Sequence, residues 1–386
     1  MRGAAALALA VCTLGCGDAS SPATPPPVTQ APTTATAQPY NMVLLSRVDL
    51  ATMAEAPHAH HHEEPIQGLG DLSGAGNWGY TTADGRRFAL TGTSVGLSVV
   101  EVTQPERPVN VALVHGPASQ WREVRTWGPF AYVSTEATHG LDIVDLRAPD
   151  RPELVRTWDR SFRSAHTLCV DEARGLLFAN GARDADRNSV GMRVLDLRRD
   201  ATNPRDLGGF GEYYIHDCYV RGNYLFASAI YHGFLAVLDI SDPARVREVT
   251  RFFTGGRFTH NSWVSSDGRH LFTTDERADR PMEAWDIADL LSPRKVSQYI
   301  ARQGTIPHNV MVDGQRALLS HYTEGVHLLD VRDPARPRVL GFYDTYDGNL
   351  SGFAGDWGAY IFPASNLIVA SDMQGGLFVV QYTGPD

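Results

Sequence analysis

Short apolar runs, each followed by an acidic residue and a turn that contains proline, recur along the chain. Each run begins at a glycine, and another strand-like stretch follows the turn. Apolar runs of this length bounded by Gly, Pro and Asp predict β-strands, and proline is tolerated at the first residue or outer edge of a strand. The four clearest units are GLSVVEVTQPERPVNVALV (96–114), GLDIVDLRAPDRPELVRTW (140–158), GFLAVLDISDPARVREVTRF (233–252) and GVHLLDVRDPARPRVLGFY (325–343).

A further pair of predicted strands precedes these units, as in residues 121–135, 219–231 and 310–322. Each repeat therefore contains four strands. The phrase that opens a repeat recurs about every 43–50 residues, and seven four-stranded units at this period predict an all-β, seven-bladed β-propeller. The residues that mark the seven openings are Trp78, Trp121, His166, His216, His260, His308 and Trp357.

The last predicted blade lacks a strand. Residues 357–382 supply three strands and then the pattern ends, whereas residues 38–50, near the N-terminus, resemble the fourth-strand segment of residues 107–116. We expect this N-terminal strand to complete the last blade, because closing the ring removes two exposed sheet edges. The sequence thus predicts one propeller domain over residues 40–384.

Composition and charge agree with this class and exclude one kind of partner. The chain of 386 residues has 36 Gly and 23 Pro and few long stretches of helical periodicity, which favours many short strands. Its net charge is -10, and no basic stripe is available to displace counterions from phosphates. We therefore expect no nucleic-acid partner.

The N-terminus has the features of an export signal. Residues 1–16 combine Arg2, an apolar run of about a dozen residues and small residues before Cys16. The TLGC sequence resembles a bacterial lipobox, so we expect a lipoprotein anchored through Cys16 to a membrane outside the cytoplasm, at the cell surface or in the periplasm. Ordinary signal cleavage a few residues later is the alternative. Residues 17–39, rich in Pro, Thr, Ala and Ser, predict an extended tether.

Two cysteines, Cys169 and Cys218, remain in the predicted propeller. An oxidising compartment permits a disulfide between them. Cys169 lies three residues after His166 and Cys218 two after His216, so their parity on adjacent strands directs them either toward each other or away. Both outcomes stay open, and we favour two separate buried thiols.

The repeated cores and their order resemble a known family. The cores GLDIVDL, FLAVLDI and VHLLDV resemble LVIVD-repeat proteins, and NWGY, SQWREV, FTHNSWVSSDGRHLFTTDE and FAGDWGAYIF occur in an order similar to the choice-of-anchor B group of bacterial surface proteins. The resemblance spans roughly residues 40–384. It implies a secreted or anchored propeller, with no established activity and no assigned catalytic residues.

Polar residues recur where each blade begins. The first strand of a propeller blade lines the central channel, so its opening residue should lie near one mouth, where ligands favour convergent polar groups. Aligning the blades places seven polar residues at equivalent positions, namely Asn77, Arg122, His166, His216, His260, His308 and Asp356. The loops after the second strands reach the same mouth and carry Glu136, His139, His232, Asp275, Glu276, His321, Glu324 and Asp372.

Three interpretations of these seven polar residues compete. In the first, each histidine fastens a loop by a hydrogen bond to backbone, as a repeated structural device. In the second, the four histidines His166, His216, His260 and His308 hold iron, copper or zinc, with Asp356 or Asp217 as a carboxylate partner. In the third, Arg122 and partly protonated histidines hold an organic or anionic ligand, with Asn77 and Asp356 as further candidate contacts.

These interpretations leave two functions. The first is an anchored binding or interaction module that recognises a small molecule or a protein at the histidine mouth. The second is a metal-dependent enzyme, an oxidoreductase or a hydrolase, that uses the four histidines. The tract HAHHHEE (58–64) is interpreted as a solvated loop that can bind transition metals adventitiously.

Overall fold

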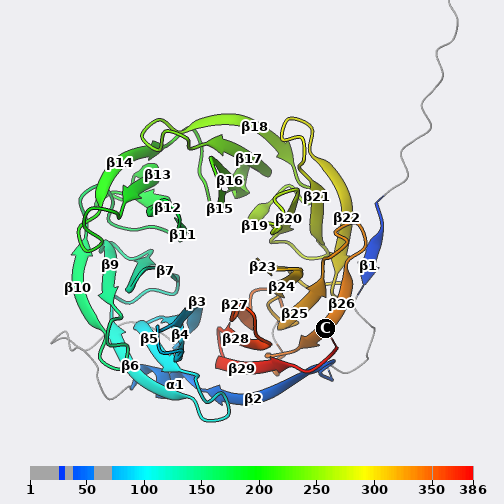
Figure 1. Ribbon diagram of the computed structural model, residues 1–386, viewed down its shortest axis with the longest axis horizontal. Coiled ribbons are helices and arrows are strands. Elements are labelled where there is room, and N and C mark those ends of the chain that lie inside the picture. The colour runs from blue at the N-terminus through cyan, green and yellow to red at the C-terminus, as the bar shows by residue number, and fades with distance from the viewer. Residues whose placement is uncertain (1–25, 31–37, 56–71, 350, 386) are drawn as a thin grey trace, which may run out of the picture.

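The computed structural model describes residues 26–30, 38–55, 72–349 and 351–385. These residues form seven sheets, antiparallel except for one added edge strand, arranged radially around a central axis (Figure 1). Within each sheet the strand that comes first after the preceding blade lies nearest the axis, and the later strands lie progressively farther out. The predicted all-β, seven-bladed β-propeller is confirmed.

The first four blades follow one another along the chain, each with four strands in sequence order. Blade 1 consists of β3 (Gly74–Thr81), β4 (Arg87–Thr93), β5 (Gly96–Glu101) and β6 (Val109–His115), and blade 2 of β7 (Arg122–Trp127), β8 (Phe130–Thr135), β9 (Leu141–Asp145) and β10 (Glu153–Trp158). Blade 3 consists of β11 (Thr167–Asp171), β12 (Leu176–Arg183), β13 (Ser189–Asp196) and β14 (Arg205–Phe210), and blade 4 of β15 (Asp217–Arg221), β16 (Tyr224–Ala229), β17 (Phe234–Asp239) and β18 (Arg247–Phe253), with the short 3-10 helix η1 (Ile230–His232) between β16 and β17.

The last three blades include both N-terminal strands of the described chain. Blade 5 consists of β19 (Thr259–Val264), β20 (His270–Asp275), β21 (Met282–Asp286), β22 (Arg294–Ile300) and the added β1 (Val28–Gln30). Blade 6 consists of β23 (Val310–Asp313), β24 (Arg316–Ser320), β25 (Val326–Asp330) and β26 (Arg338–Tyr343), and blade 7 of β27 (Asp356–Ile361), β28 (Leu367–Asp372), β29 (Gly376–Tyr382) and β2 (Met42–Val48).

The ring closes through blade 7, as the sequence predicts. Strand β2 pairs antiparallel with β29, from Met42 opposite Tyr382 to Val48 opposite Leu377. Met42 and Val48 are both buried, so this strand adds core contacts as well as backbone hydrogen bonds. The two ends of the described propeller therefore lie in one sheet, which protects the edge of β29.

Part of the predicted tether is a strand. Residues Val28–Gln30 pair in parallel with residues 298–300 on the outer edge of blade 5 (Figure 1). Thr29 Oγ1 also donates to Pro337 O at 3.0 Å in blade 6. The expectation of an extended tether over residues 17–39 thus needs a correction at residues 28–30, where backbone groups find partners on an open sheet edge.

The acidic residue at the end of each repeated apolar run has a structural role. Asp145 and Asp330 each accept a hydrogen bond from the main-chain N–H two residues later, at 2.9 and 3.0 Å, and each pairs with the arginine at that position. A side chain that binds the backbone two residues on forms an Asx-turn. This turn ends the third strand and explains the repeated acidic residue before the proline-containing segment.

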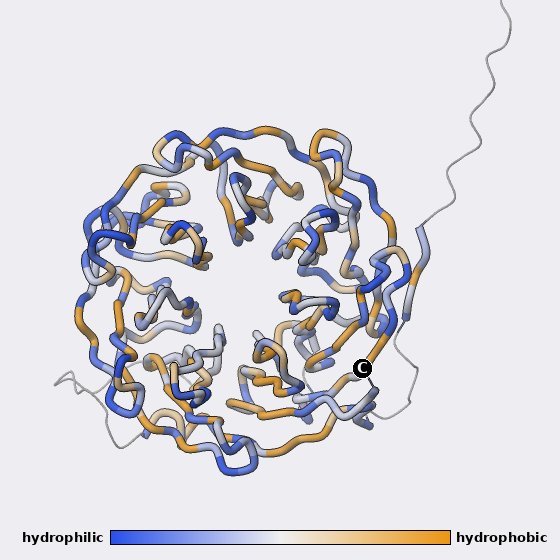
Figure 2. The backbone as a smooth tube through the Cα atoms, viewed as in Figure 1, coloured by the Kyte–Doolittle hydropathy of each residue, from blue (hydrophilic) through white to orange (hydrophobic). Residues whose placement is uncertain are grey.

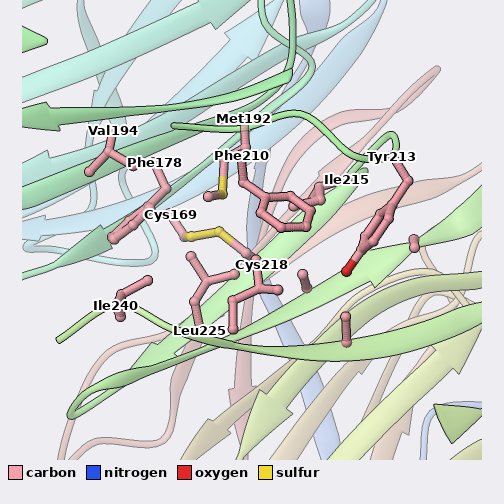
Figure 3. Packing of buried hydrophobic residues seen from close by; sticks show 14 of the residues in the cluster. Cys169, Phe178, Met192, Val194, Phe210, Tyr213, Ile215, Cys218, Leu225 and Ile240 are labelled. Carbon is pink, nitrogen blue, oxygen red and sulfur yellow. A yellow bond between two sulfur atoms is a disulfide. The ribbon is translucent and has the colours of Figure 1, made fainter. Parts of the chain in front are cut away.

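Apolar side chains from neighbouring blades pack against one another, and hydrophobic stretches recur around the ring (Figure 2). Between blades 3 and 4, Cys169 and Cys218 form a disulfide that joins the inner strands β11 and β15. Phe178, Met192 and Phe210 pack close to this bond (Figure 3). The preference for two separate thiols was wrong, because the opposite parity of the two residues directs both sulfur atoms into the same gap between blades.

The described N-terminal part also contains α1 (Leu50–Ala54), whose Met53 is fully buried. No helix among the described residues is long and apolar enough to cross a membrane. The predicted signal and lipobox at residues 1–16, with Cys16, and the HAHHHEE tract at residues 58–64 lie outside the described residues.

Candidate functional site

The four predicted histidines lie side by side where the inner strands of blades 3 to 6 begin. Successive ring centroids are 4.3 Å apart from His166 to His216, 4.2 Å from His216 to His260 and 4.4 Å from His260 to His308. His216, His260 and His308 are buried, and His166 is partly exposed. The repeat therefore brings the four imidazoles into one arc at a single mouth of the ring.

Two tryptophans extend this arc. The ring of Trp357 lies 4.4 Å from that of His308, and Trp357 in turn stacks on Trp121 at 4.5 Å. The sequence alignment placed Arg122 and Asp356 in line with the histidines, but the structure places the neighbouring tryptophans there. In blade 7 the irregular pairing of β27 with β28 falls at Trp357, just as that of β19 with β20 falls at His260, so Trp357 is the equivalent of His260.

The three residues predicted to contact an anionic ligand are buried, and Arg122 and Asn77 already have hydrogen-bond partners within the protein. Arg122 is buried and donates to Thr93 O at 2.9 Å and to Pro117 O at 2.6 Å, and burial lowers its pKa to about 10. Asn77 donates to Val369 O at 3.0 Å. Asp356 is fully buried, and burial and the nearby Asp372 raise its pKa well above the usual value.

Two histidines fasten neighbouring blades through Nδ1. His216 Nδ1 donates to the main-chain carbonyl of His260 at 3.0 Å, and His308 Nδ1 donates to that of Trp357. Each bond connects the opening residue of one blade to the opening residue of the next. A neutral imidazole that donates from Nδ1 has its lone pair on Nε2. The fastening interpretation thus accounts for one nitrogen of these rings and leaves Nε2 of each as an acceptor.

His166 and His216 form a separate pair. Their Nε2 atoms are 2.7 Å apart. Since His216 Nε2 carries the lone pair, His166 Nε2 must donate, and His166 Nδ1 lies 2.7 Å from Glu136 Oε1. The His166 ring therefore connects the Glu136 carboxylate to the His216 ring. A separation of 2.7 Å is that of a hydrogen bond, so no metal ion fits between the two histidines in this arrangement.

The other two histidines converge on a carboxylate. His260 Nε2 and His308 Nε2 each lie 3.7 Å from Glu276 Oε1, and the three ligand atoms are all within 4.8 Å of one another. Tyr322 donates its hydroxyl to the same carboxylate oxygen at 2.5 Å. His308 Nε2 is buried and has no hydrogen-bond partner within the described chain. We call His260, Glu276 and His308 the triad.

Burial keeps three histidines of the arc, His216, His260 and His308, neutral. It lowers the pKa of His260 to about 3 and that of His308 to about 3, with the neighbouring imidazoles adding to the effect. The pKa of His216 is lowered well below its usual value for the same reasons. Neutral imidazoles are the form that binds metals. The triad can therefore offer two neutral nitrogens and one carboxylate oxygen at neutral pH.

Sequence reasoning placed Glu276 at this mouth without identifying it as a partner of two histidines, and it missed Trp121, Trp357 and Tyr322. The tryptophans had a signal, since they mark blade openings as the histidines do. Other acidic or histidine residues predicted at this mouth have structural partners. His139 pairs with Asp142 at 2.9 Å, and Asp275 accepts from Gly256 N at 2.8 Å.

Comparison with known proteins supports the fold. The LVIVD repeat family model matches residues 214–254, which cover blade 4. No curated protein matches the chain in sequence.

Among solved structures, a protein of Bacteroides uniformis ATCC 8492 provisionally assigned as a 6-phosphogluconolactonase is 13% identical, with a TM-score of 0.56 over 78% of this chain and 88% of that one. A similarly assigned protein of Bacteroides fragilis NCTC 9343 is 12% identical, with a TM-score of 0.54 over 78% of this chain and 86% of that one. At such identities the likeness concerns the fold alone. The chain is thus a seven-bladed β-propeller that carries an LVIVD repeat.

Proposed function

We propose that the protein is an extracytoplasmic ligand-binding module whose histidine mouth holds a divalent transition-metal ion. The single observation that carries this proposal is the triad, in which two neutral imidazole nitrogens and a carboxylate oxygen lie within 4.8 Å of one another. A ligand that coordinates the ion would be recognised where the convergent polar groups of the mouth meet.

The spacing and donor set of the triad suit zinc or ferrous iron. In a tetrahedral site with metal–ligand bonds of about 2.0–2.1 Å, neighbouring ligand atoms are about 3.3 Å apart. The two histidine–glutamate separations of 3.7 Å approach this value, so closure needs only small side-chain movements. Two histidines and one carboxylate leave coordination positions open, which is the pattern of sites that bind an exogenous ligand.

Hydrogen bonds around the triad support a metal role. Histidine ligands commonly donate their other ring nitrogen to a carbonyl or carboxylate, which fixes the ring orientation. His308 does so to Trp357 O, and Tyr322 fixes Glu276 through its hydroxyl. The hydrogen bond that connects His308 to the next blade thus also orients a candidate metal ligand.

The proposed location outside the cytoplasm has independent support from the Cys169–Cys218 disulfide, since such bonds persist mainly in oxidising compartments. Attachment to a membrane through a lipid on Cys16 is part of the proposal. It is tested by labelling cells with radioactive palmitate, which the wild-type protein should incorporate and a Cys16→Ser variant should not.

A metal-dependent enzyme is the second candidate. The observation that favours it is the His166–Glu136 contact of 2.7 Å, which lies two rings away from His260 along the arc. A histidine hydrogen-bonded to a carboxylate near an open metal position resembles the acid–base groups of many hydrolytic and redox sites. In this second function the same triad holds the metal ion, but the bound ligand is a substrate that is chemically converted.

Metal content measured by mass spectrometry tests the proposal. The protein is purified without an affinity tag and with His58, His60, His61 and His62 replaced by Asn, so that the histidine tract contributes nothing. We expect about one zinc or iron per chain and its loss in His260→Ala. His232→Ala, at an exposed histidine on a loop of the same mouth, is the matched control. A protein that stays metal-free after incubation with these ions overturns the proposal.

A further inference from the structure

A cavity opens at the end of the central channel opposite the histidines. It has a volume of about 370 Å³, and its lining includes residues at the far ends of the inner strands, such as Asp171 and Asp313. The histidines lie at the starting ends of the same strands. This cavity is therefore separate from the triad, and nothing in the proposed function uses it.

Aromatic rings form much of the wall of this cavity. Trp78 and Tyr360 pack with ring centroids 5.0 Å apart, and Tyr219 and Trp263 pack at 4.6 Å. Trp78, Tyr219 and Trp263 are only partly buried, although they lie on innermost strands. Met311 adds a polarizable side chain to the same wall. Such a wall suits a ligand with an apolar body or a cation that faces the rings.

The Trp78 ring already contacts a cationic side chain of the protein itself. The Arg125 guanidinium carbon lies 4.4 Å from the centroid of the Trp78 ring, within the range of a cation–π contact. Arg125 also pairs with Glu123, which offsets its charge, and donates to Val124 O at 2.8 Å. The built-in pair shows that this ring system accommodates a cation and that Arg125 is not free for an anion.

The charged residues that line the cavity indicate the sign of the charge on its ligand. Three acidic residues, Asp171, Glu172 and Asp313, line the cavity, against the single base Arg125. Arg174 and Arg316 pair with Asp171 and Asp313 at 2.5 and 2.7 Å, and no ion pair of Glu172 is found in the described chain. The arginines offset the charges of Asp171 and Asp313, so Glu172 and the ring faces are left to attract a cation.

We propose that this cavity binds a small organic cation, an amine or a quaternary ammonium group carried on an apolar body. Aromatic rings with acidic neighbours recognise such groups because the negative ring face and the carboxylates attract the charge while the alkyl groups contact apolar surface. The volume admits a molecule of this size but not a polymer.

Binding of choline, compared with its uncharged isostere 3,3-dimethylbutan-1-ol, tests the inference by calorimetry at fixed ionic strength. We expect saturable choline binding and at least tenfold weaker binding of the isostere. Trp263→Leu should weaken choline binding about tenfold or more, and Glu172→Gln should weaken it by a smaller factor. Tyr231→Leu, at a 71% exposed aromatic residue beside the histidine mouth, is the control that should bind normally.

Equal binding of the charged and uncharged probes would overturn the inference, because the cavity would then recognise apolar shape alone. Tighter binding of benzoate than of choline, or no choline binding at millimolar concentrations, would overturn it as well. His260→Ala should leave choline affinity unchanged, so failure of the metal proposal and failure of this one are distinguishable. Urea unfolding of Trp263→Leu shows whether a loss of binding comes from loss of the fold.

Discussion

His308 donates its Nδ1 proton to the main-chain carbonyl of Trp357, the residue that opens the next blade. This bond fixes the orientation and the tautomer of the imidazole ring, so the Nε2 lone pair faces Glu276. The side chain is only 1% exposed, so Nε2 is shielded from solvent. A buried acceptor without a partner costs stability. The arrangement is therefore costly for a structural fastener and well suited to a metal ligand.

Removing the carboxylate of the triad should abolish tight metal binding. Glu276→Gln keeps the size of the side chain and its contact with Tyr322, but it removes the negative charge, so we expect zinc affinity to fall about 100-fold or more. Competition with a chromophoric chelator measures the change. Glu212→Gln, an exposed residue of the loop before β15, should bind zinc as the wild type does. Equal affinities in the two variants would contradict the assignment.

Acid should destabilise the protein through its buried histidines. The pKa of His308 is about 3 in the folded protein and near 6.5 in the unfolded chain. Below pH 6.5 the unfolded chain binds a proton that the folded protein does not, so this contribution to stability is complete above pH 6.5 and is lost as the pH falls toward 3.

A His308→Gln variant tests this effect. Between pH 5.5 and 4, its free energy of unfolding should change with pH less steeply than that of the wild type, by up to about 1.4 kcal/mol per pH unit. Urea unfolding of both proteins across this range measures the slopes. Identical slopes would mean that His308 titrates alike in the folded and unfolded states.

Reduction of the disulfide should weaken the contact between blades 3 and 4. The bond closes a loop of 49 residues, for which chain-entropy arguments give a contribution of about 4 kcal/mol, and native disulfides typically contribute about 2–5 kcal/mol. Urea unfolding with and without reductant measures the loss. A Cys169→Ala, Cys218→Ala double variant should respond to reductant no further, whereas a continued response would point to another cause.

The closing strand should be essential and the docked strand dispensable. Deleting residues 1–37 removes β1 and keeps β2, so we expect a monomer with a cooperative thermal transition. Deleting residues 1–49 removes β2 and exposes the edge of β29, so we expect aggregation. Size-exclusion chromatography compares the two deletions. A soluble, cooperative 1–49 deletion would contradict closure through this strand.

A methyl group at Gly79 should displace the ring of Tyr360. A Cβ at this position would lie 2.1 Å from Tyr360 Cε1, so Gly79→Ala should lower the free energy of unfolding by about 1–3 kcal/mol. At Gly211 a Cβ would meet no atom within 4 Å, which makes Gly211→Ala the matched control. Thermal unfolding of both variants measures the difference, and equal stabilities would place Tyr360 elsewhere.

The fold was predictable because every blade repeats the same sequence pattern. Each apolar run between a glycine and an Asx-turn marks a third strand, and the period of the openings gives the blades. The closing strand was predictable from its likeness to other fourth strands. Pairing of residues 28–30 with blade 5 was not, because a short polar segment on an open sheet edge has no hydrophobic pattern.

The candidate site was predictable only in part. Four histidines at blade openings predicted one arc, but not its division into the His166–His216 pair and the triad, because that division depends on which loop brings which carboxylate. Glu136 and Glu276 occupy similar places in sequence, yet one binds His166 and the other faces His260 and His308. Irregular strand pairing falls at both His260 and Trp357, which makes these two residues equivalent, and sequence spacing does not reveal this.

Anomalous diffraction from crystals grown with zinc, recorded at the zinc absorption edge, tests the central claim most directly. We expect one strong peak per chain at the histidine mouth, about 2.0–2.1 Å from His260 Nε2 and His308 Nε2 and about 2.0–2.2 Å from Glu276. The absence of a peak there, or a peak only at other residues, would contradict this expectation and leave the histidines as fasteners between blades.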